Sequence, residues 1–175
     1  FNYVDKGLDV THDNDTQSDH GTHVSGIAAS NTYVKQVAAN GAVTFVKQEN
    51  GVCGVAPNAQ IMTMKVFGRG GGAYASDYME AIEDAVLLGA DAVNLSLGSA
   101  VPGKSYSGVA YTDKVMDSLV NSDTVVSFSA GNNSYWSEHN LANDVGLNYA
   151  EDVSQQTGGS PGSMKNSFTV ASAVN

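Results

Sequence analysis

The sequence predicts an α/β domain built around a mostly parallel sheet with flanking helices. Apolar runs of strand length alternate along the chain with segments of helical periodicity. The connections between these runs are long enough for the crossovers that parallel strands require. With 175 residues and a hydrophobic fraction of 42%, the chain has the size and composition of one globular domain with a core.

Five apolar runs are the expected strands. Each is bounded by glycine or by polar residues, as strands usually are. In chain order they are FNYV (1–4), AQIMTMKVF (59–67), ADAVNLSLG (90–98), TVVSFSAGN (124–132) and SFTVASAV (167–174). A glycine cluster, GRGGG (68–72), directly follows the second run.

Three segments have helical periodicity. The first begins after Ser18 or Asp19, either of which can cap it, and continues through Val24, Ile27 and Ala28. The second is capped by Ser76 and stopped by Gly89, and its apolar face is Tyr78, Ala81, Ile82, Ala85 and Val86. The third covers 111–122, with an apolar face of Val115, Met116, Leu119 and Val120. The sequence of residues 31–53 does not indicate what this segment does.

Charge and cysteine content exclude several classes of protein. The net charge of −10 argues against nucleic acid and anionic membrane surfaces as partners, because both require basic patches. No stretch predicts membrane insertion or a signal peptide. Cys53 is the single cysteine, so no internal disulfide is expected, and its expected role is a small buried hydrophobe. The chain begins without methionine inside an expected strand, which predicts a piece of a longer protein.

One edge of the expected sheet is the predicted place for a site. Glycines at 68–72, 98 and 131 follow three of the expected strands, and ligands of such sheets bind beyond the carboxyl ends of the strands. His20 would stand in the first turn of its helix, where the helix dipole disfavours a positive charge. A neutral histidine can act as a general base. Gly21 and Gly26 would let this helix lie close against the sheet, and His23 is expected to be buried.

The residues alone leave other interpretations open. His20 and His23, with Asp13, Asp15 and Asp19 nearby, could bind a metal, although helical ligand pairs are usually four residues apart. GRGGGA imitates a dinucleotide-binding turn, but the acid expected at the far end of the next strand is absent. A histidine in an apolar helix is also often simply packed.

Four blocks, in this order, resemble the subtilisin-like serine peptidases: HGTHVSGIAAS, GVAPNAQIMTMKVF, NLSLG and VVSFSAGN. FNYVD and the ending GSPGSMKNSFTVASAVN are most similar to the large cell-envelope proteinases of Gram-positive bacteria. The resemblance implies a three-layer α/β fold, incomplete in this chain, and peptide hydrolysis by an aspartate, histidine and serine triad. It implies His20 as the general base and Asn132 as the side-chain donor to the oxyanion.

The resemblance also implies a groove for an extended polypeptide substrate. One wall would be Ser96, Leu97 and Gly98, and the other Gly71 and Gly72, with Gly70 beside them. Ala130 and Gly131 would form the floor of the pocket for the side chain before the cut. Glycine suits such walls because it lets substrate backbone approach closely.

Two members of the triad have no convincing counterpart here. The nearest imitation of the serine motif, GSPGSM (159–164), precedes a strand instead of opening a helix, so Ser163 is rejected as the nucleophile. Asp5 is a candidate for the acid, but Lys6 replaces the family's small hydroxyl residue, and a solvated turn carboxylate is the favoured interpretation. Residues 1–175 are therefore expected to be the central part of a catalytic domain whose aspartate and serine lie elsewhere, and this piece alone is expected to be inactive.

The parent protein is expected to be secreted and anchored to the cell wall. Its partners would be polypeptide substrates and the remaining parts of its own catalytic domain, with no nucleic acid and no membrane insertion. Catalysis would require no cofactor, and Ca²⁺ would serve only as a structural ion, for which Asp13, Asp15 and Asp19 lack a diagnostic spacing. The alternative function is a non-catalytic subtilisin-like domain used for binding or as a scaffold.

Overall fold

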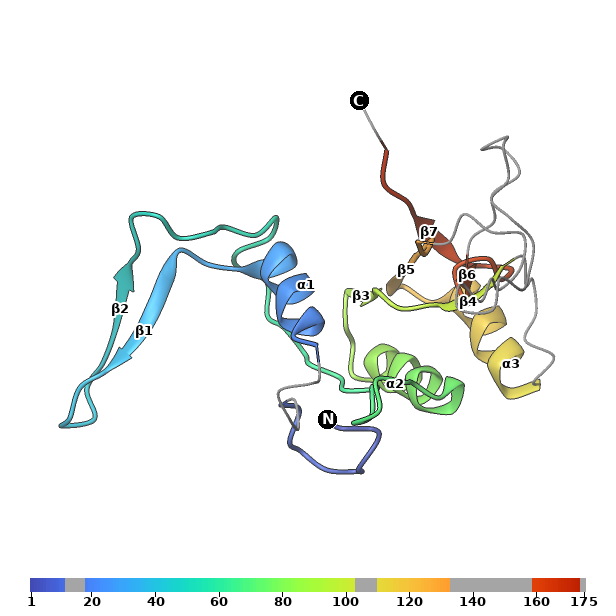
Figure 1. Cartoon of the computed structure of the whole chain (residues 1–175), viewed down its shortest axis with the longest axis horizontal. Helices are drawn as coiled ribbons and strands as arrows, with labels where there is room; N and C mark the ends of the chain where they lie inside the picture. The colour runs from blue at the N-terminus through green and yellow to red at the C-terminus, as the bar shows by residue number, and fades with distance from the viewer. Residues whose placement is uncertain (12–17, 103–109, 133–158, 174–175) are drawn as a thin grey trace, which may run out of the picture. The chain divides into compact units, whose positions relative to one another are not determined.

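The chain forms two units, Phe1–Tyr74 and Ala75–Asn175, which are described separately. The computed structural model describes residues 1–11, 18–102, 110–132 and 159–173 (Figure 1). The first unit holds one helix and a hairpin, and the second holds the larger sheet and two further α-helices. Among the described residues, no helix has both the length and the apolar character needed to cross a membrane.

The sheet of the second unit is parallel, as the sequence predicts. Its strands are β3 (Ala92–Leu95), β5 (Val125–Ser129) and β7 (Phe168–Val170), in the order β3-β5-β7. β3 pairs with β5 from Ala92 opposite Val125 to Leu95 opposite Phe128. β5 pairs with β7 from Ser127 opposite Phe168 to Ser129 opposite Val170. All three strands correspond to runs identified in the sequence.

Two helices cover one face of this sheet. They are α2 (Ala75–Leu87) and α3 (Ala110–Ser118), the latter continued by the 3-10 helix η1 (Leu119–Asn121). Alternate strand residues share a face, so Leu95, Val126 and Phe128 all point to the helices. The buried core is Met79, Ile82, Leu95, Val115, Met116, Val126, Phe128 and Met164.

Most of the expected helical faces are confirmed, and two details are corrected. α2 begins at Ala75, so Ser76 lies inside the helix and is not its N-cap. Val120 was expected on the apolar face of the third helix but is exposed, because the α-helix ends at Ser118 and the tighter 3-10 turn rotates the following side chains.

The end of α2 is fixed by a glycine. Gly89 has φ +79°, its N–H donates to Val86 O, and the N–H of Ala90 donates to Ala85 O. This is a Schellman ending, which favours glycine at the left-handed position. The two helices also contact each other through the Tyr111 hydroxyl, which donates to the Glu83 carboxylate. Desolvation and this hydrogen bond raise the pKa of Tyr111 to about 12.

A short antiparallel pair that the sequence did not predict follows β3. β4 (Ser99–Pro102) pairs with β6 (Gly159–Ser160), with Ser99 opposite Ser160. The N–H of Gly159 donates to Ala130 O at 2.9 Å. The segment before β7 is therefore tied to the ends of both β3 and β5.

In the first unit, α1 (His20–Ala29) forms where the sequence predicts a helix. The carbonyls of its last turn accept N–H groups from the loop 54–56: Gly54 donates to Ser30 O and Val55 to Ile27 O. A Cβ on Gly54 would lie 2.6 Å from Ser30 N, so glycine is required for this close approach. Gly21 and Gly26 were expected to let this helix lie close against the sheet. In the described part of this unit, a Cβ on either residue would meet no atom within 4 Å, so no close approach that requires glycine is observed there.

The segment without a sequence-based interpretation forms a hairpin. β1 (Tyr33–Val37) pairs antiparallel with β2 (Val43–Lys47). Gly41, at φ +81°, donates its N–H to Ala38 O, and the Asn40 side chain accepts the N–H of Ala42. Asn-Gly between two valine-rich stretches is a strong hairpin signal, and it could have been used to predict this element.

Two expected strands are not formed as strands. FNYV and 59–67 are joined by an isolated parallel bridge of Asn2 with Lys65, with the N–H of Tyr3 donating to Lys65 O. The Asn2 side chain explains why the first run ends so early. Its Oδ1 accepts the N–H groups of Val4 and Asp5, which turns the chain directly after Tyr3.

The buried core of the second unit leads to a prediction about the free energy of unfolding. Met79→Ala is expected to lower the free energy of unfolding by about 2–5 kcal/mol, because the Met79 side chain is fully buried and its loss leaves a cavity. Leu87→Ala in the same helix is the matched control, expected within about 0.5 kcal/mol of the original chain because Leu87 is 82% exposed. Denaturant unfolding measures both, and equal effects would contradict this description of the core.

Candidate functional site

His20 is the first residue of α1. Its backbone N–H donates to Ser18 Oγ at 3.1 Å, while Asp19 occupies the N-cap position without a side-chain capping bond. Ser18, one of the two expected caps, therefore receives one of the N–H groups that a helix start leaves unpaired. His20 is an exposed residue at the N-terminal end of the helix.

His23 and Cys53 differ from their expected environments. Both were expected to be buried, and both are exposed. No residue of α1 is buried, so the face that carries His23 has no covering element within the described part of the first unit. Cys53 lies in the irregular loop that returns from the hairpin, between Val52, whose C=O accepts a hydrogen bond from Ser30 Oγ, and Gly54, whose N–H donates to Ser30 O.

Ser96, Leu97 and Gly98 directly follow β3, and Ala130, Gly131 and Asn132 directly follow β5. Because β3 and β5 are parallel neighbours, these two segments leave the sheet side by side at its carboxyl edge. A hydrogen bond from Ser129 Oγ to Leu97 O, 3.0 Å long, joins them. The structure thus brings together the predicted groove wall, the predicted pocket floor and the predicted amide donor.

Further polar contacts hold this edge. Asn94 Nδ2 donates to Ser96 Oγ at 2.9 Å, which orients the Ser96 hydroxyl. Ser127 Oγ donates to Val93 O at 3.2 Å, one strand pair deeper in the sheet. Asn94, Ser127 and Ser129 were not among the residues predicted for the site. Their alternation along β3 and β5, on the face opposite the apolar core residues, is the signal that could have identified them.

A glycine turn sets the direction of Asn132. Gly131 has φ +90°, a conformation that other residues rarely adopt, so the chain changes direction at the end of β5. A Cβ on Gly131 would lie 3.5 Å from Gly159 N, which shows how closely the segment 159–162 approaches. Asn132 is exposed directly after this turn.

Gly71 and Gly72 lie in a tight turn of the first unit. The N–H of Gly71 donates to Gly68 O, and the N–H of Gly68 donates to Gly72 O. Gly71 has φ +78°, which explains a glycine at that position. His20, Gly71 and Gly72 thus belong to the first unit, and the other predicted site residues belong to the second.

The two doubtful triad candidates lie in turns. Asp5 accepts a hydrogen bond from Asn2 Nδ2 at 3.0 Å, inside the turn that follows Tyr3. Ser163 lies between β6 and β7, where its N–H donates to Gly159 O, and no helix begins there. That other residues serve as the acid and the nucleophile stays a prediction.

The metal interpretation finds no support among the described residues. Within 1–11, 18–102, 110–132 and 159–173, no three His, Cys, Asp or Glu side chains lie close enough together to hold a metal ion. Asp13 and Asp15, which the sequence analysis considered for metal binding, lie outside the described residues.

Comparisons with known proteins show the family to which the chain belongs. The model of the subtilase family matches residues 1–175. The PI-type proteinase of Lactococcus lactis subsp. cremoris is 32% identical over 178 residues, covering 100% of this chain and 8% of that protein. The C5a peptidase of Streptococcus pyogenes is 32% identical over 156 residues, covering 88% of this chain and 12% of that protein.

A solved structure shares the fold. The S41 psychrophilic protease superimposes with a TM-score of 0.58 and 26% sequence identity, over 97% of this chain and 44% of that one. The chain therefore spans less than half of this structure and a small part of the curated relatives. Since the family model matches the chain from end to end, the chain belongs to the subtilase family.

Proposed function

We propose that this chain is the central part of the catalytic domain of a longer serine endopeptidase. The observation that carries the proposal is the carboxyl edge of the second unit's sheet. There Ser96–Gly98 and Ala130–Asn132 lie side by side, joined by the bond between Ser129 and Leu97. We propose that an extended peptide pairs with the backbone at this edge, and that the carboxamide of Asn132 beside it polarises the peptide carbonyl.

In the proposed reaction, a serine outside this chain attacks the scissile carbonyl. His20 takes the proton of that serine and later gives it to the leaving amine, while an aspartate outside this chain orients the imidazole. The exposed position of His20 at the start of α1 supports this role, because a general base must be accessible to the groups whose protons it moves. The 175-residue chain alone is expected to be inactive, since its nearest imitation of the serine motif lies in a turn.

Asn132 is the proposed donor to the oxyanion. As the carbonyl carbon becomes tetrahedral, negative charge develops on its oxygen, and a fixed amide N–H stabilises that charge. The turn at Gly131 supports this assignment because it fixes the backbone immediately before the carboxamide. A backbone N–H would complete the oxyanion site.

The proposed substrate is an extended polypeptide. It would lie along Ser96, Leu97 and Gly98 as an added strand, with Gly71 and Gly72 on its other side. Ala130 and Gly131 would form the floor of the pocket for the residue before the cut. We further propose that the parent protein is secreted and wall-anchored and that any Ca²⁺ is structural, which the resemblance to envelope proteinases and the net charge of −10 support.

His20→Ala in the complete proteinase is expected to lower kcat by about 10⁶, the loss known for removal of the histidine in subtilisin. His23→Ala is the matched control, because it removes an equally exposed imidazole from the same helix. It is expected to leave kcat within about threefold of the original, as an exposed residue outside the site would. Steady-state hydrolysis of a peptide substrate measures both, and turnover retained in His20→Ala would indicate a non-catalytic or differently built domain.

Asn132→Ala is expected to reduce kcat by about 10²–10³, a magnitude known for the corresponding donor of subtilisin, with KM nearly unchanged. The reason is that the oxyanion exists only in the transition state and not in the bound substrate. Asn121→Ala, an exposed position at the end of η1, serves as control. A rise in KM without a fall in kcat would instead assign Asn132 to substrate binding.

Ser129→Ala tests the positioning of the groove wall. Loss of its bond to Leu97 O is expected to raise KM about threefold to tenfold for peptides that reach along Ser96–Gly98, and to leave single-residue amide substrates unaffected. Thr124→Val removes the same kind of bond, from Thr124 Oγ1 to Ala90 O at the amino end of the two strands, and is expected to leave KM for both kinds of substrate unchanged. Equal effects of the two variants would mean that Ser129 acts only through stability.

A further inference from the structure

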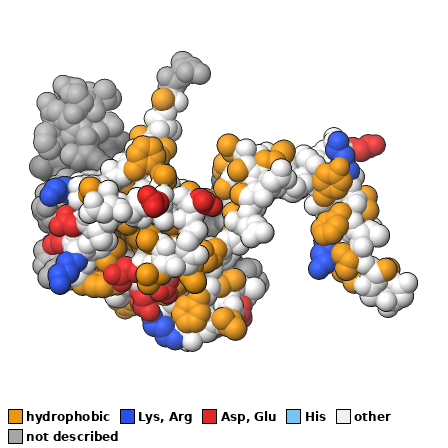
Figure 2. Space-filling model, turned by 180° about the vertical axis from the view of Figure 1, so that it is seen from behind, with side chains coloured by type: hydrophobic (Ala, Val, Ile, Leu, Met, Phe, Trp, Pro, Cys, Tyr) orange, Lys and Arg blue, Asp and Glu red, His pale blue; other side chains and the backbone are white. Residues whose placement is uncertain are grey.

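The hairpin of the first unit exposes apolar side chains that no described element covers. Every residue of β1 and β2 is exposed, including Tyr33, Val34, Val37, Val43, Phe45 and Val46. Figure 2 shows hydrophobic side chains along this hairpin, with Lys side chains among them. A two-stranded ribbon alone is only marginally stable in water, and an open apolar edge is a template for another strand.

The base of the hairpin is firmly attached to α1. The N–H of Gln48 donates to Thr32 O at 2.8 Å, and Ser30 Oγ donates to Val52 O at 2.9 Å. These contacts follow the C-terminal end of α1, whereas His20 stands at its other end, about 15 Å away along the helix axis at 1.5 Å per residue. The hairpin is therefore separated from His20 by the length of α1.

The hydrogen-bond pattern shows which backbone groups face outward. Thr32 bonds with Gln48 at the base of the hairpin, and the N–H of Ala38 donates to Ala42 O at its tip. Hydrogen-bonded and non-bonded pairs alternate in an antiparallel ribbon, so the odd-numbered residues of β1 point their N–H and C=O groups to the outer edge. The N–H of Tyr33 follows this pattern: it donates to Asn31 Oδ1 and not to a residue of β2.

Lys35 and Val37 remain at the open edge of β1. Among the described residues, β1 pairs with β2 alone, so nothing in that part of the chain continues the sheet beyond this edge. A third strand could bond with both residues. Its own residue opposite Lys35 would place a side chain on the same face as the Lys35 ammonium.

The face that carries Lys35 holds a second lysine, Lys47, and is otherwise apolar. Opposite residues share a face, so the pairs Tyr33 with Lys47, Lys35 with Phe45, and Val37 with Val43 all lie on one side. Tyr33 and Val37 flank Lys35 along β1, and they are 52% and 62% exposed. A complementary strand would therefore carry apolar residues two positions before and two positions after the residue opposite Lys35.

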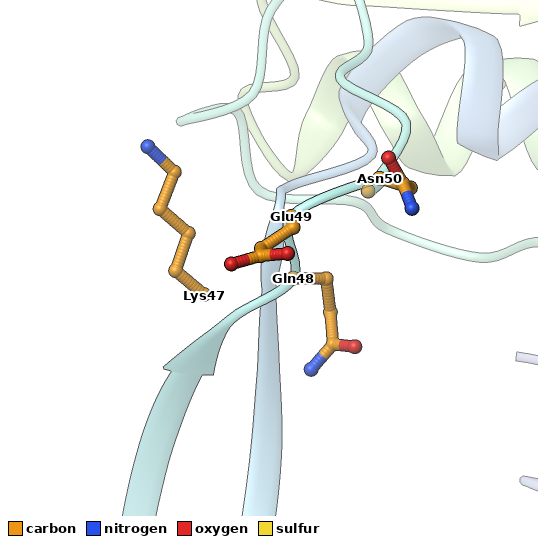
Figure 3. A pocket seen from close by; sticks show the side chains of 5 residues that line it. Lys47, Gln48, Glu49 and Asn50 are labelled. Atoms are coloured by element: carbon orange, nitrogen blue, oxygen red, sulfur yellow. The ribbon is translucent and has the colours of Figure 1, made fainter.

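The positive charge of Lys35 indicates which kind of residue a bound strand would place opposite it. The segment 31–48 holds two of the chain's 8 basic residues and none of its 18 acidic ones. Glu49 and Lys47 both line a hollow at the end of β2 (Figure 3), and Glu49 follows Lys47 by two residues in the chain. Lys35 has no acidic residue within the hairpin. A second copy pairing through β1 would bring two Lys35 side chains onto one small sheet, which like-charge repulsion disfavours.

We propose that the β1 edge binds an extended strand of another polypeptide in which an acidic residue stands between two apolar residues, each two positions away. The strand would receive backbone hydrogen bonds from Lys35 and Val37, and its carboxylate would pair with the Lys35 ammonium. This binding does not depend on proteolytic activity.

The test is fluorescence anisotropy of the 175-residue chain with the labelled peptide TVTETVT, and with TVTKTVT as its charge-reversed counterpart. TVTETVT is expected to bind, and to bind more weakly as salt rises from about 50 to about 300 mM. Lys35→Glu is expected to weaken this binding about threefold to tenfold and to favour TVTKTVT instead. Lys114→Glu, the same charge change on the exposed surface of α3, is the matched control and is expected to have no effect.

Amide hydrogen exchange gives a second, independent measurement. Bound TVTETVT is expected to slow exchange at the outward amides of Lys35 and Val37 and to leave those of Val34 and Gln36 unchanged, because the latter already bond to β2. Equal affinity for both peptides, unchanged exchange at Lys35 and Val37, concentration-dependent self-association through the hairpin, or binding of anionic phosphatidylglycerol vesicles in place of the peptide would each overturn the proposal.

Discussion

The parallel pairing of β3 with β5 is the constraint on which the candidate site depends. Its register places Leu95 opposite Phe128, so the two strands turn one face to α2 and α3 and end at the same edge. A slip of one residue would send the core side chains to the other face, and the buried core therefore fixes the register. The same register places Ser129 where its hydroxyl reaches Leu97 O, so the core also positions the groove wall.

The sequence predicts the second unit well because its local signals and its packing agree. Gly98 and Gly131 follow β3 and β5 within three residues, and Gly89 stops α2 in the conformation that favours glycine. Met79 is the informative omission: it is fully buried, although it lies beside the expected apolar stripe, because α3 covers α2 from the side. Such a contact between helices cannot be seen in the periodicity of one helix.

The first unit was predicted less well because tertiary and side-chain contacts decide it. The turn that shortens FNYV depends on the side chain of Asn2, and the exposure of His23 depends on which elements cover α1. Asn40-Gly41 was a readable signal for the hairpin. For the candidate site, sequence motifs place His20 at the start of a helix and Asn132 just after a strand. Each motif, however, describes only its own segment of the chain. Their joint action in catalysis requires contacts across the whole domain.

The most direct test of this account is a crystal structure of the complete proteinase with a peptide aldehyde bound at the nucleophile. The account predicts that Asn132 Nδ2 lies about 3 Å from the oxyanion and that a ring nitrogen of His20 lies within hydrogen-bond distance of the attacking serine oxygen. A structure with the His20 ring and the Asn132 carboxamide on opposite faces of the folded protein would contradict it.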